Sequence, residues 1–257
     1  SAHSSYRSPR YQFIQMIEPT SRIRSVVTAI GLTYGSTILG SIVVAVAAML
    51  LTVVGINITT RPSLRLVMST VLLQGVTFGG LSVLYLRFRD LDVEFVPLSI
   101  PDKRDVVVTI GGIVALLGLL VVASMIISSL GLESAQNQIV TIAQQNPATF
   151  LLLIPLSFLV VGPFEELLYR GIIQGTLRET LHPTRAIVLA SALFASIHLF
   201  SLTGEVKLVY IGIAFVLALV LGATYEYTDN LAVPAVVHGA YNAVQFTSAY
   251  LTATGGM

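Results

Sequence analysis

The sequence predicts an all-α fold, a polytopic bundle of transmembrane helices. Of the 257 residues, 54% are hydrophobic, and the mean hydropathy is +0.85. The apolar residues form unbroken runs of about 20, the length that crosses a bilayer core. Asp, Glu, Lys and Arg make up only 11% of the chain, against about 25% in soluble domains. We therefore expect an integral membrane protein in contact with the lipid bilayer.

Seven apolar stretches, or eight at most, are expected to cross the bilayer as helices. They are continuously apolar rather than alternating, which argues against the strands of a barrel. No internal repeat divides the chain, so residues 1–24 are expected to form a cytoplasmic tail and residues 25–253 a single transmembrane domain. The expected spans are 25–54, 64–86, 106–129, 149–170, 185–201, 208–226 and 231–253.

The distribution of Lys and Arg predicts the orientation. Eleven of the 14 precede the first span or lie in the connections after the second and fourth spans, whereas Arg61, Arg65 and Lys207 fall on the other side. Because cytoplasmic loops carry the excess of Lys and Arg, we expect a cytoplasmic N-terminus, an external C-terminus and a place in the cell membrane. The external connection 131–148 is expected to include a short interfacial helix.

Composition excludes several kinds of site. A net charge of +1 provides no concentrated basic surface for nucleic acid. The chain has no Cys, which excludes disulfides, thiol nucleophiles and zinc sites built on thiolates.

A few polar side chains fall inside the apolar stretches. Glu165 and Glu166 lie in the fourth, His198 in the fifth, and His238 and Asn242 in the seventh. A charged side chain at the bilayer centre costs about 2.5–3.5 kcal/mol on insertion scales, so such residues face the interior of the bundle. We expect these groups to converge on one buried polar cavity, reached from the cytoplasmic side or from the lipid.

Helical spacing sorts these residues. Glu166 and Arg170 are four residues apart, so they share a helix face and are expected to form an ion pair. Glu165 is turned by about 100° from Glu166 and has no basic neighbour at helical spacing. Phe194 and His198 repeat the four-residue spacing. Taken singly, the ion pair could tether helices, a histidine could be a satisfied hydrogen-bond partner, and Phe194 could be ordinary packing.

The expected spans place Glu165 and His198 at different depths. Glu165 would lie near the cytoplasmic end of a span that ends at residue 170, whereas His198 would lie closer to the outer face. Ideal upright helices would keep them apart, so either the fourth span sits deeper or the region 181–185 is itself buried.

Peptide hydrolysis is the chemistry that these groups best support. The sequence contains neither the Gly-x-Ser-Gly of a rhomboid-type protease nor the His-Glu-x-x-His of a zincin, and no Asp lies within a span. What remains is Glu165 with His198 as a general-base pair that activates water, and His238 with Asn242 as donors to the oxyanion.

Three motifs in order, Glu165-Glu166-x-x-x-Arg170, Phe194-x-x-x-His198 and His238-x-x-x-Asn242, resemble the CAAX prenyl protease and bacteriocin-processing family, which includes the type II CAAX endopeptidase. The match covers about residues 149–245. The resemblance implies catalytic Glu165, His198, His238 and Asn242, with Glu166, Arg170 and Phe194 supporting them. It also implies a membrane-bound peptide or prenylated protein as substrate, cleaved near its C-terminus.

Three alternatives stay open. The family is also labelled metalloprotease, and Glu165, His198 and His238 could bind zinc. We prefer a reaction without a cofactor, because no separate general base would remain if Glu165 were a zinc ligand. A transporter or proton pathway would also use intramembrane Glu and His. A non-catalytic immunity or scaffold protein is the third, but none of the motif residues is lost.

Overall fold

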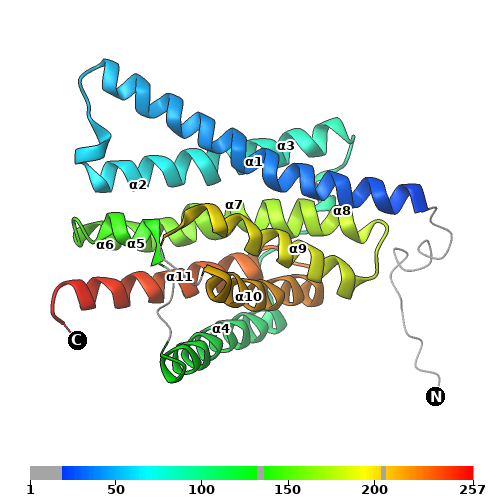
Figure 1. Ribbon diagram of the computed structural model, residues 1–257. Coiled ribbons are helices and arrows are strands. Elements are labelled where there is room, and N and C mark those ends of the chain that lie inside the picture. Colours follow the sequence, from blue (N-terminus) through cyan, green and yellow to red (C-terminus); the bar gives the residue numbers. More distant parts are fainter. Residues whose placement is uncertain (1–18, 132–135, 204–206, 257) are drawn as a thin grey trace.

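The computed structural model describes residues 19–131, 136–203 and 207–256, and it is a bundle of long helices (Figure 1). The helices are α1 (Pro19–Val53), α2 (Pro62–Thr70), α3 (Gly79–Phe88), α4 (Lys103–Ser129), α5 (Gln138–Ala143), α6 (Ala148–Leu156), α7 (Gly162–Glu166), α8 (Gly175–Arg178), α9 (Pro183–Ile197), α10 (Lys207–Thr228) and α11 (Ala232–Ala253).

Short segments of other geometry join or interrupt these helices. Three are π-helical: η4 (Val71–Phe78), η6 (Ser157–Val161) and η7 (Leu167–Gln174). Three are 3₁₀-helical: η3 (Ile58–Thr60), η5 (Val93–Phe95) and η8 (His198–Ser201). Two-residue strands, β1 (Gln136–Asn137) and β2 (Leu202–Thr203), pair antiparallel.

The all-α transmembrane fold class is confirmed. Six helices of the described residues are long and apolar enough to cross a membrane: Ser21–Val53, Pro62–Phe88, Lys103–Ser129, Ala148–Arg178, Pro183–Ser201 and Lys207–Thr228. The seventh expected span is present as the 22-residue helix α11 but does not meet the same apolar criterion. A short helix is present within the connection 131–148, namely α5.

Two helix boundaries differ from the expected limits. Helix α1 begins at Pro19, so residues 19–24 of the expected tail are helical, and residues 1–18 lie outside the described part of the chain. The fourth span continues past residue 170 to Arg178. Arg170 therefore lies inside this helix and not in the connection after it. Without Arg170, ten Lys and Arg residues remain on the expected cytoplasmic side and three on the other side.

The helices run back and forth between two ends of the bundle (Figure 1). The connections α3–α4, α8–α9 and α10–α11 lie at one end, which we call the basic end because Arg89, Lys103, Arg104, Arg178 and Arg185 lie in or beside them. The connections α1–α2 and α5–α6 lie at the opposite end, together with the C-terminus. Successive connections thus lie at alternate ends of the bundle, as the sequence predicts.

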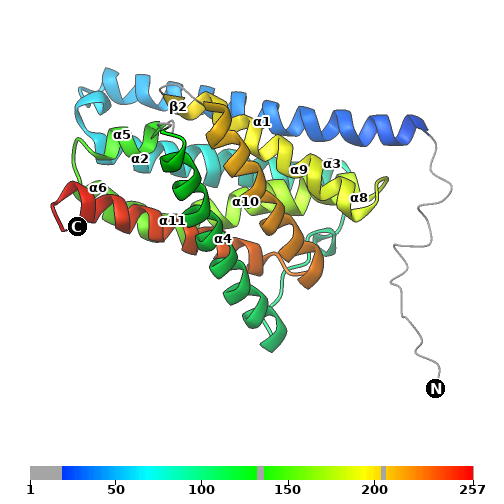
Figure 2. The same cartoon turned by 60° about the horizontal axis from the view of Figure 1, so that its bottom comes forward.

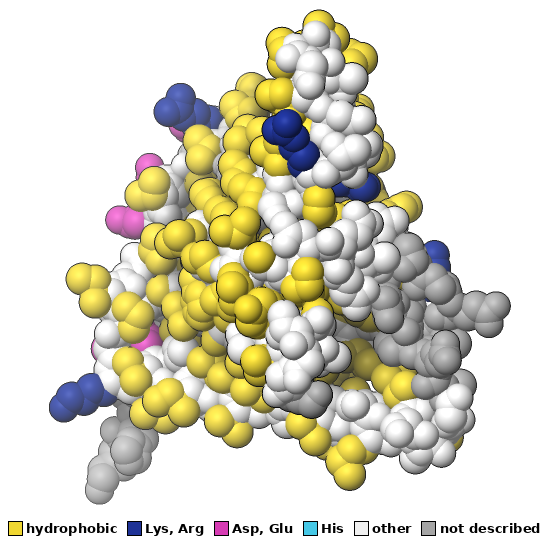
Figure 3. Space-filling model, turned by 90° about the vertical axis from the view of Figure 1, so that its left-hand side faces the viewer, with side chains coloured by type: hydrophobic (Ala, Val, Ile, Leu, Met, Phe, Trp, Pro, Cys, Tyr) yellow, Lys and Arg dark blue, Asp and Glu magenta, His cyan; other side chains and the backbone are white. Residues whose placement is uncertain are grey.

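Helices α1 and α4 form the periphery. Only 11% of the apolar window of each is buried, against 39% for α10. Helix α4 crosses the front of the bundle against α10 and α11 (Figure 2). Figure 3 shows the end of the bundle that carries the α1–α2 connection, where hydrophobic side chains are mixed with other side chains. Large apolar side chains are exposed along α1 and α4, for example Ile38 and Val107, as expected for helices that face lipid rather than water.

The fourth long helix continues through two prolines. Pro155 and Pro163 lack the N–H that an α-helix uses at each position. The π-helical segment η6 lies between the two prolines, and η7 begins directly after Glu166. Such π-segments are frequent at functional sites. This helix carries both glutamates of the first motif.

Two glycines let α11 approach this helix closely. A Cβ added at Gly162 would collide with the carbonyl oxygen of Ala235, and one at Gly239 would lie 2.9 Å from the carbonyl oxygen of Ser157. Small residues at a helix contact allow this separation in a membrane. The close approach brings the His238 side chain of α11 next to Glu165 and Glu166.

Candidate active site

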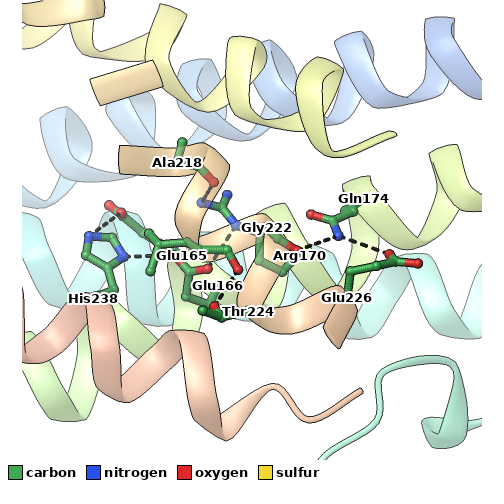
Figure 4. Close-up of polar contacts among 10 residues, drawn as sticks. Glu165, Glu166, Arg170, Gln174, Ala218, Gly222, Thr224, Glu226 and His238 are labelled. Carbon is green, nitrogen blue, oxygen red and sulfur yellow. Dashed lines mark hydrogen bonds and ion pairs between the residues drawn. The ribbon is translucent and has the colours of Figure 1, made fainter. Parts of the chain in front are cut away.

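Glu165, Glu166, Arg170 and His238 form a polar cluster inside the bundle (Figure 4). Glu166 is its buried centre. Its Oε2 lies 3.1 Å from Arg170 Nε, and both side chains are fully buried. Its Oε1 accepts a 2.8 Å hydrogen bond from His238 Nδ1. The ion pair predicted from the four-residue spacing is therefore present, and His238 is a second partner that the spacing alone could not indicate.

Glu165 points to a different set of partners. Gln74 Nε2, on η4, donates a 2.9 Å hydrogen bond to Glu165 Oε1. Glu165 Oε2 lies 3.8 Å from His238 Nε2, which is longer than a direct hydrogen bond. Among the described residues, the histidine within 4 Å of Glu165 is His238. The sequence had instead led us to expect His198 next to Glu165 as its partner in general-base catalysis.

Gln74 is a partner of Glu165 that the motifs in the sequence do not indicate. It lies in the apolar run Val71–Phe78, and its side chain is buried. Gln74 is uncharged and belongs to none of the three motifs. An isolated Gln in an apolar stretch is a signal that could have identified the residue.

His198 stands at the end of α9, where the chain turns into η8. Its Nδ1 lies 2.9 Å from the carbonyl oxygen of Phe194. Because a carbonyl oxygen only accepts, Nδ1 carries the proton, and in the neutral imidazole Nε2 has the free lone pair. The Phe194 carbonyl thus fixes the tautomer of His198.

The Phe194 ring touches several members of the cluster. Its centroid lies 4.9 Å from that of His198 and 5.9 Å from that of His238. The guanidinium carbon of Arg170 lies 5.0 Å from the same centroid, within reach of a cation–π interaction. Phe194 therefore packs against both histidines and against the cation that pairs with Glu166.

A cavity of about 300 Å³ joins three of the four predicted catalytic residues, His198, His238 and Asn242. Helices α4, α9, α10 and α11 form its wall. Glu165 is outside this lining and reaches the cavity through His238. The complete lining is Leu116, Leu120, Ala123, Ser124, Ile127, Phe194, His198, Tyr210, Ile213, Ala214, Leu217, Leu221, His238, Tyr241, Asn242 and Gln245.

The helix boundaries resolve the difference in depth between Glu165 and His198. Glu165 precedes the end of its helix at Arg178 by 13 residues, and His198 follows the start of α9 at Pro183 by 15. The two helices are joined by a short turn at the basic end. Their residues therefore lie about 20 Å from that end at a rise of about 1.5 Å per residue.

Four ionisable side chains form one compact buried cluster. The Arg170 guanidinium lies 3.1 Å from Glu166 Oε2. The His238 imidazole lies within 4 Å of both carboxylates, with Nδ1 at 2.8 Å from Glu166 and Nε2 at 3.8 Å from Glu165. Because an unpaired charge is costly in a low-dielectric interior, these contacts allow two carboxylates to lie together in the bundle.

A second buried network extends toward the basic end. Gln174 Nε2 donates to the carbonyl oxygen of Gly222 at 3.2 Å and lies 3.5 Å from Glu226 Oε2. Arg178 Nε pairs with Glu226 Oε1 at 2.9 Å. These contacts fasten the fourth helix to α10 (Figure 4).

The zinc alternative would use the side chains of Glu165, His198 and His238 as ligands. In the described ranges, no group of three or more His, Asp or Glu side chains is arranged to hold a metal ion. His238 Nδ1 is already engaged by Glu166, which leaves Nε2 as its free nitrogen. The three side chains of the alternative, Glu165, His198 and His238, therefore do not form a gathered ligand set.

Residues 147–244 match the family model described as type II CAAX prenyl endopeptidase Rce1-like. This confirms the family resemblance, and the matched range covers all three motifs. Comparisons with curated proteins and with solved structures gave no match.

Proposed function

Because residues 147–244 belong to the type II CAAX prenyl endopeptidase Rce1-like family, we propose that this protein hydrolyses a peptide bond near the C-terminus of a membrane-associated, CAAX-type prenylated substrate. One observation carries the proposal: His198, His238 and Asn242 line the same intramembrane cavity. Glu165 lies next to this cavity, with its Oε2 3.8 Å from His238 Nε2. The family and the transmembrane helices make the chain an integral membrane protein of a protease family.

In the proposed reaction, Glu165 is the general base. Gln74 donates to Oε1 and holds the carboxylate, so that Oε2 is directed toward His238. The water oxygen bonds to the scissile carbonyl carbon while one water proton passes to Glu165. That proton then goes to the leaving amine as the C–N bond breaks, as in general acid–base catalysis. His198 Nε2 would orient the water, because its Nδ1 is held by Phe194.

His238 and Asn242 are proposed to stabilise the oxyanion. A protonated His238 donates from Nδ1 to Glu166 and retains an Nε2–H for the developing negative charge. Asn242 lies one helical turn further along α11 and lines the same cavity. Oriented donors of this kind stabilise the transition state without reorganisation during the reaction.

We propose that the reaction requires no metal. A zinc ion would polarise the carbonyl or the water, but its ligands would have to include Glu165, the group that we assign as base. This proposal is supported by the described ranges, where no cluster of three or more His, Asp or Glu side chains is arranged for a metal ion. Purified protein treated with a strong chelator is expected to keep its activity, and loss of activity restored by zinc would support the metal-dependent alternative.

The direct test uses a farnesylated CAAX peptide and detergent-purified protein, with release of the C-terminal peptide as the readout. The wild type is expected to cleave, and Glu165→Gln is expected to be inactive. Glu94→Gln is the matched control, because Glu94 is a carboxylate outside the motifs. No cleavage of any prenylated or unprenylated membrane peptide by the wild type would argue against the proposal.

We propose that the basic end faces the cytoplasm. The ten-to-three distribution of Lys and Arg supports this orientation, and it gives a cytoplasmic N-terminus in the cell membrane. Introduced cysteines near residues 100 and 140 should react with an impermeant reagent from the cytoplasmic and the external side, respectively. Labelling of position 140 only from the cytoplasmic side would contradict the orientation.

A further inference from the structure

A groove of about 290 Å³ lies between α1 and α9, and it shares no lining residue with the cavity that contains His198 and His238. The two helices contact each other and both begin at the basic end, so they run parallel (Figure 1, Figure 2). Among the lining residues, Ala29 and Leu177 are fully buried, whereas Ile30 is 42% exposed. The groove therefore has a buried floor and a rim that is open to the surface of the bundle.

One arginine on each helix lies on the face that lines the groove. Three lining residues of each helix follow an arginine by four, seven and eight positions, a spacing that keeps them on the same helix face. On α1 the arginine is Arg22, and the lining residues are Val26, Ala29 and Ile30. On α9 the arginine is Arg185, and the lining residues are Leu189, Ala192 and Leu193. Both walls of the groove thus begin one helical turn beyond an arginine.

The two arginines lie at the same end of the groove. The side chains of Ser25 and Thr180 are hydrogen-bonded to each other, which joins the first turns of α1 to the connection that leads into α9. Arg22 and Arg185 are three residues before Ser25 and five residues after Thr180, respectively, and both are exposed. Their guanidinium groups are therefore placed at the basic end, where the bundle leaves the bilayer core.

These two arginines have no acidic partner. In the ranges that the structure describes, neither Arg22 nor Arg185 forms an ion pair with a carboxylate. The carboxylates of the α8–α9 connection and of α10, Glu179 and Glu226, each pair with another arginine. Two cations are thus left for a negative charge that comes from outside the chain.

We infer that this groove binds an anionic phospholipid of the leaflet at the basic end, with the phosphate at Arg22 and Arg185 and one acyl chain along the groove. Arginine forms strong charge-assisted hydrogen bonds with phosphate, and basic pockets between transmembrane helices bind anionic headgroups. The groove lining contains no Asp, Glu, Lys or Arg, as a hydrocarbon chain requires. This binding site goes beyond the proposed function and does not depend on it.

The far end of the groove limits how deep the chain can reach. There the hydroxyls of Tyr34 and Ser196 are hydrogen-bonded to each other at 2.9 Å and join α1 to α9. From Val26 to Tyr34 the lining extends over about 12 Å of helix at the usual rise. The site therefore accommodates the headgroup and the first part of one acyl chain.

Five variants separate the headgroup contact from the groove. Arg22→Gln and Arg185→Gln each remove one of the two cations. Arg24→Gln is their matched control, because Arg24 is exposed on the same helix but is turned by about 200° from Arg22. Ala192→Phe fills the groove at its exposed rim, and Ala45→Phe adds the same bulk at an exposed position of α1 outside the lining.

Native mass spectrometry of the full chain in detergent would measure the Kd for phosphatidylglycerol and for phosphatidylcholine with the same acyl chains. The wild type is expected to bind phosphatidylglycerol at least about tenfold more tightly. Arg22→Gln and Arg185→Gln should each lose about fivefold in affinity for phosphatidylglycerol, the contribution of one arginine near an anionic membrane surface. Ala192→Phe should weaken the binding of both lipids, and the two controls should keep the wild-type values.

Three outcomes would overturn the inference. Equal affinity of the wild type for the two lipids, or an equal loss in Arg24→Gln and Arg22→Gln, would show that there is no anionic site at this groove. Wild-type affinity in Ala192→Phe would show that the acyl chain lies elsewhere. Binding of glycerol phosphate, which has no acyl chain, as tightly as phosphatidylglycerol would show that the ligand is not a lipid. Because binding is measured without peptide cleavage, a failure of the proposed function would leave each of these results unchanged.

Discussion

Two adjacent glutamates belong to regions of opposite character. Glu166, with Arg170 and Gln174, forms a paired region: Glu166 is fully buried and engaged by both Arg170 and His238. Glu165 belongs to the proposed catalytic region with His198 and Asn242, and its hydrogen-bond donor is the amide of Gln74. Successive residues of a helix point about 100° apart, so one helix directs the two adjacent carboxylates to different sets of partners. His238 contacts both regions.

The largest effect is expected from Glu165→Ala. If this carboxylate alone accepts the proton from water, turnover should fall about 10⁴-fold, the upper range for general acid–base catalysis. The thermal unfolding midpoint should change little, since Glu165 carries no ion pair with Arg170. Peptide release and unfolding in detergent would be measured together. Residual activity above one tenth of wild type would place the base elsewhere.

The paired region should respond in the opposite way. Arg170→Ala leaves Glu166 as a buried charge without its guanidinium, which costs about 3–5 kcal/mol, so yield and thermal stability should fall sharply. Glu165→Gln is nearly isosteric and should unfold close to wild type. Arg89→Ala is the control for an exposed pair with Glu179 and should cost at most about 1 kcal/mol.

Equal stability of Arg170→Ala and Glu165→Gln would contradict the division into two regions. A stable Arg170→Ala with normal turnover would show that His238 alone compensates Glu166. Either outcome is visible in a thermal melt of detergent-purified protein.

Asn242→Ala tests the oxyanion role and should have a smaller effect than loss of the base. Removing one oxyanion donor typically lowers turnover about 10²–10³-fold, so a measurable activity should remain. The neighbouring Ala243, which is outside the cavity lining, provides a control as Ala243→Gly. Wild-type turnover in Asn242→Ala would restrict oxyanion stabilisation to His238.

Local geometry explains what the sequence could predict. The Glu166–Arg170 pair and the Phe194–His198 contact follow from four-residue spacing on one helix, and both are present. The runs of apolar residues were sufficient to predict the helical fold class and the six long apolar helices. Roles assigned to Glu165, His198, His238 and Asn242 remain predictions, but the structure places these residues around one site.

Contacts between helices could not be predicted in the same way. His238 reaches Glu166 because Gly162 and Gly239 allow a close approach, and spacing along one chain segment does not contain that information. The apparent difference in depth arose because Arg170 was interpreted as the end of a span. A buried, paired Arg is compatible with a helix that continues to Arg178.

The smallest effect is expected from two buried glutamines, one in contact with each region. Gln74→Leu removes the donor to Glu165 Oε1, and a hydrogen bond to a charged group is worth about 1.5–3 kcal/mol. Because Gln74 positions the base without touching substrate, kcat should fall about 10- to 100-fold while KM stays near its wild-type value. Gln174→Leu instead removes contacts to Gly222 and Glu226, so it should lower the unfolding midpoint while the folded fraction keeps its kcat. Steady-state kinetics and thermal melts of both variants would separate positioning from packing. A Gln74→Leu protein that loses stability but keeps kcat would assign Gln74 to the paired region and remove its proposed part in catalysis.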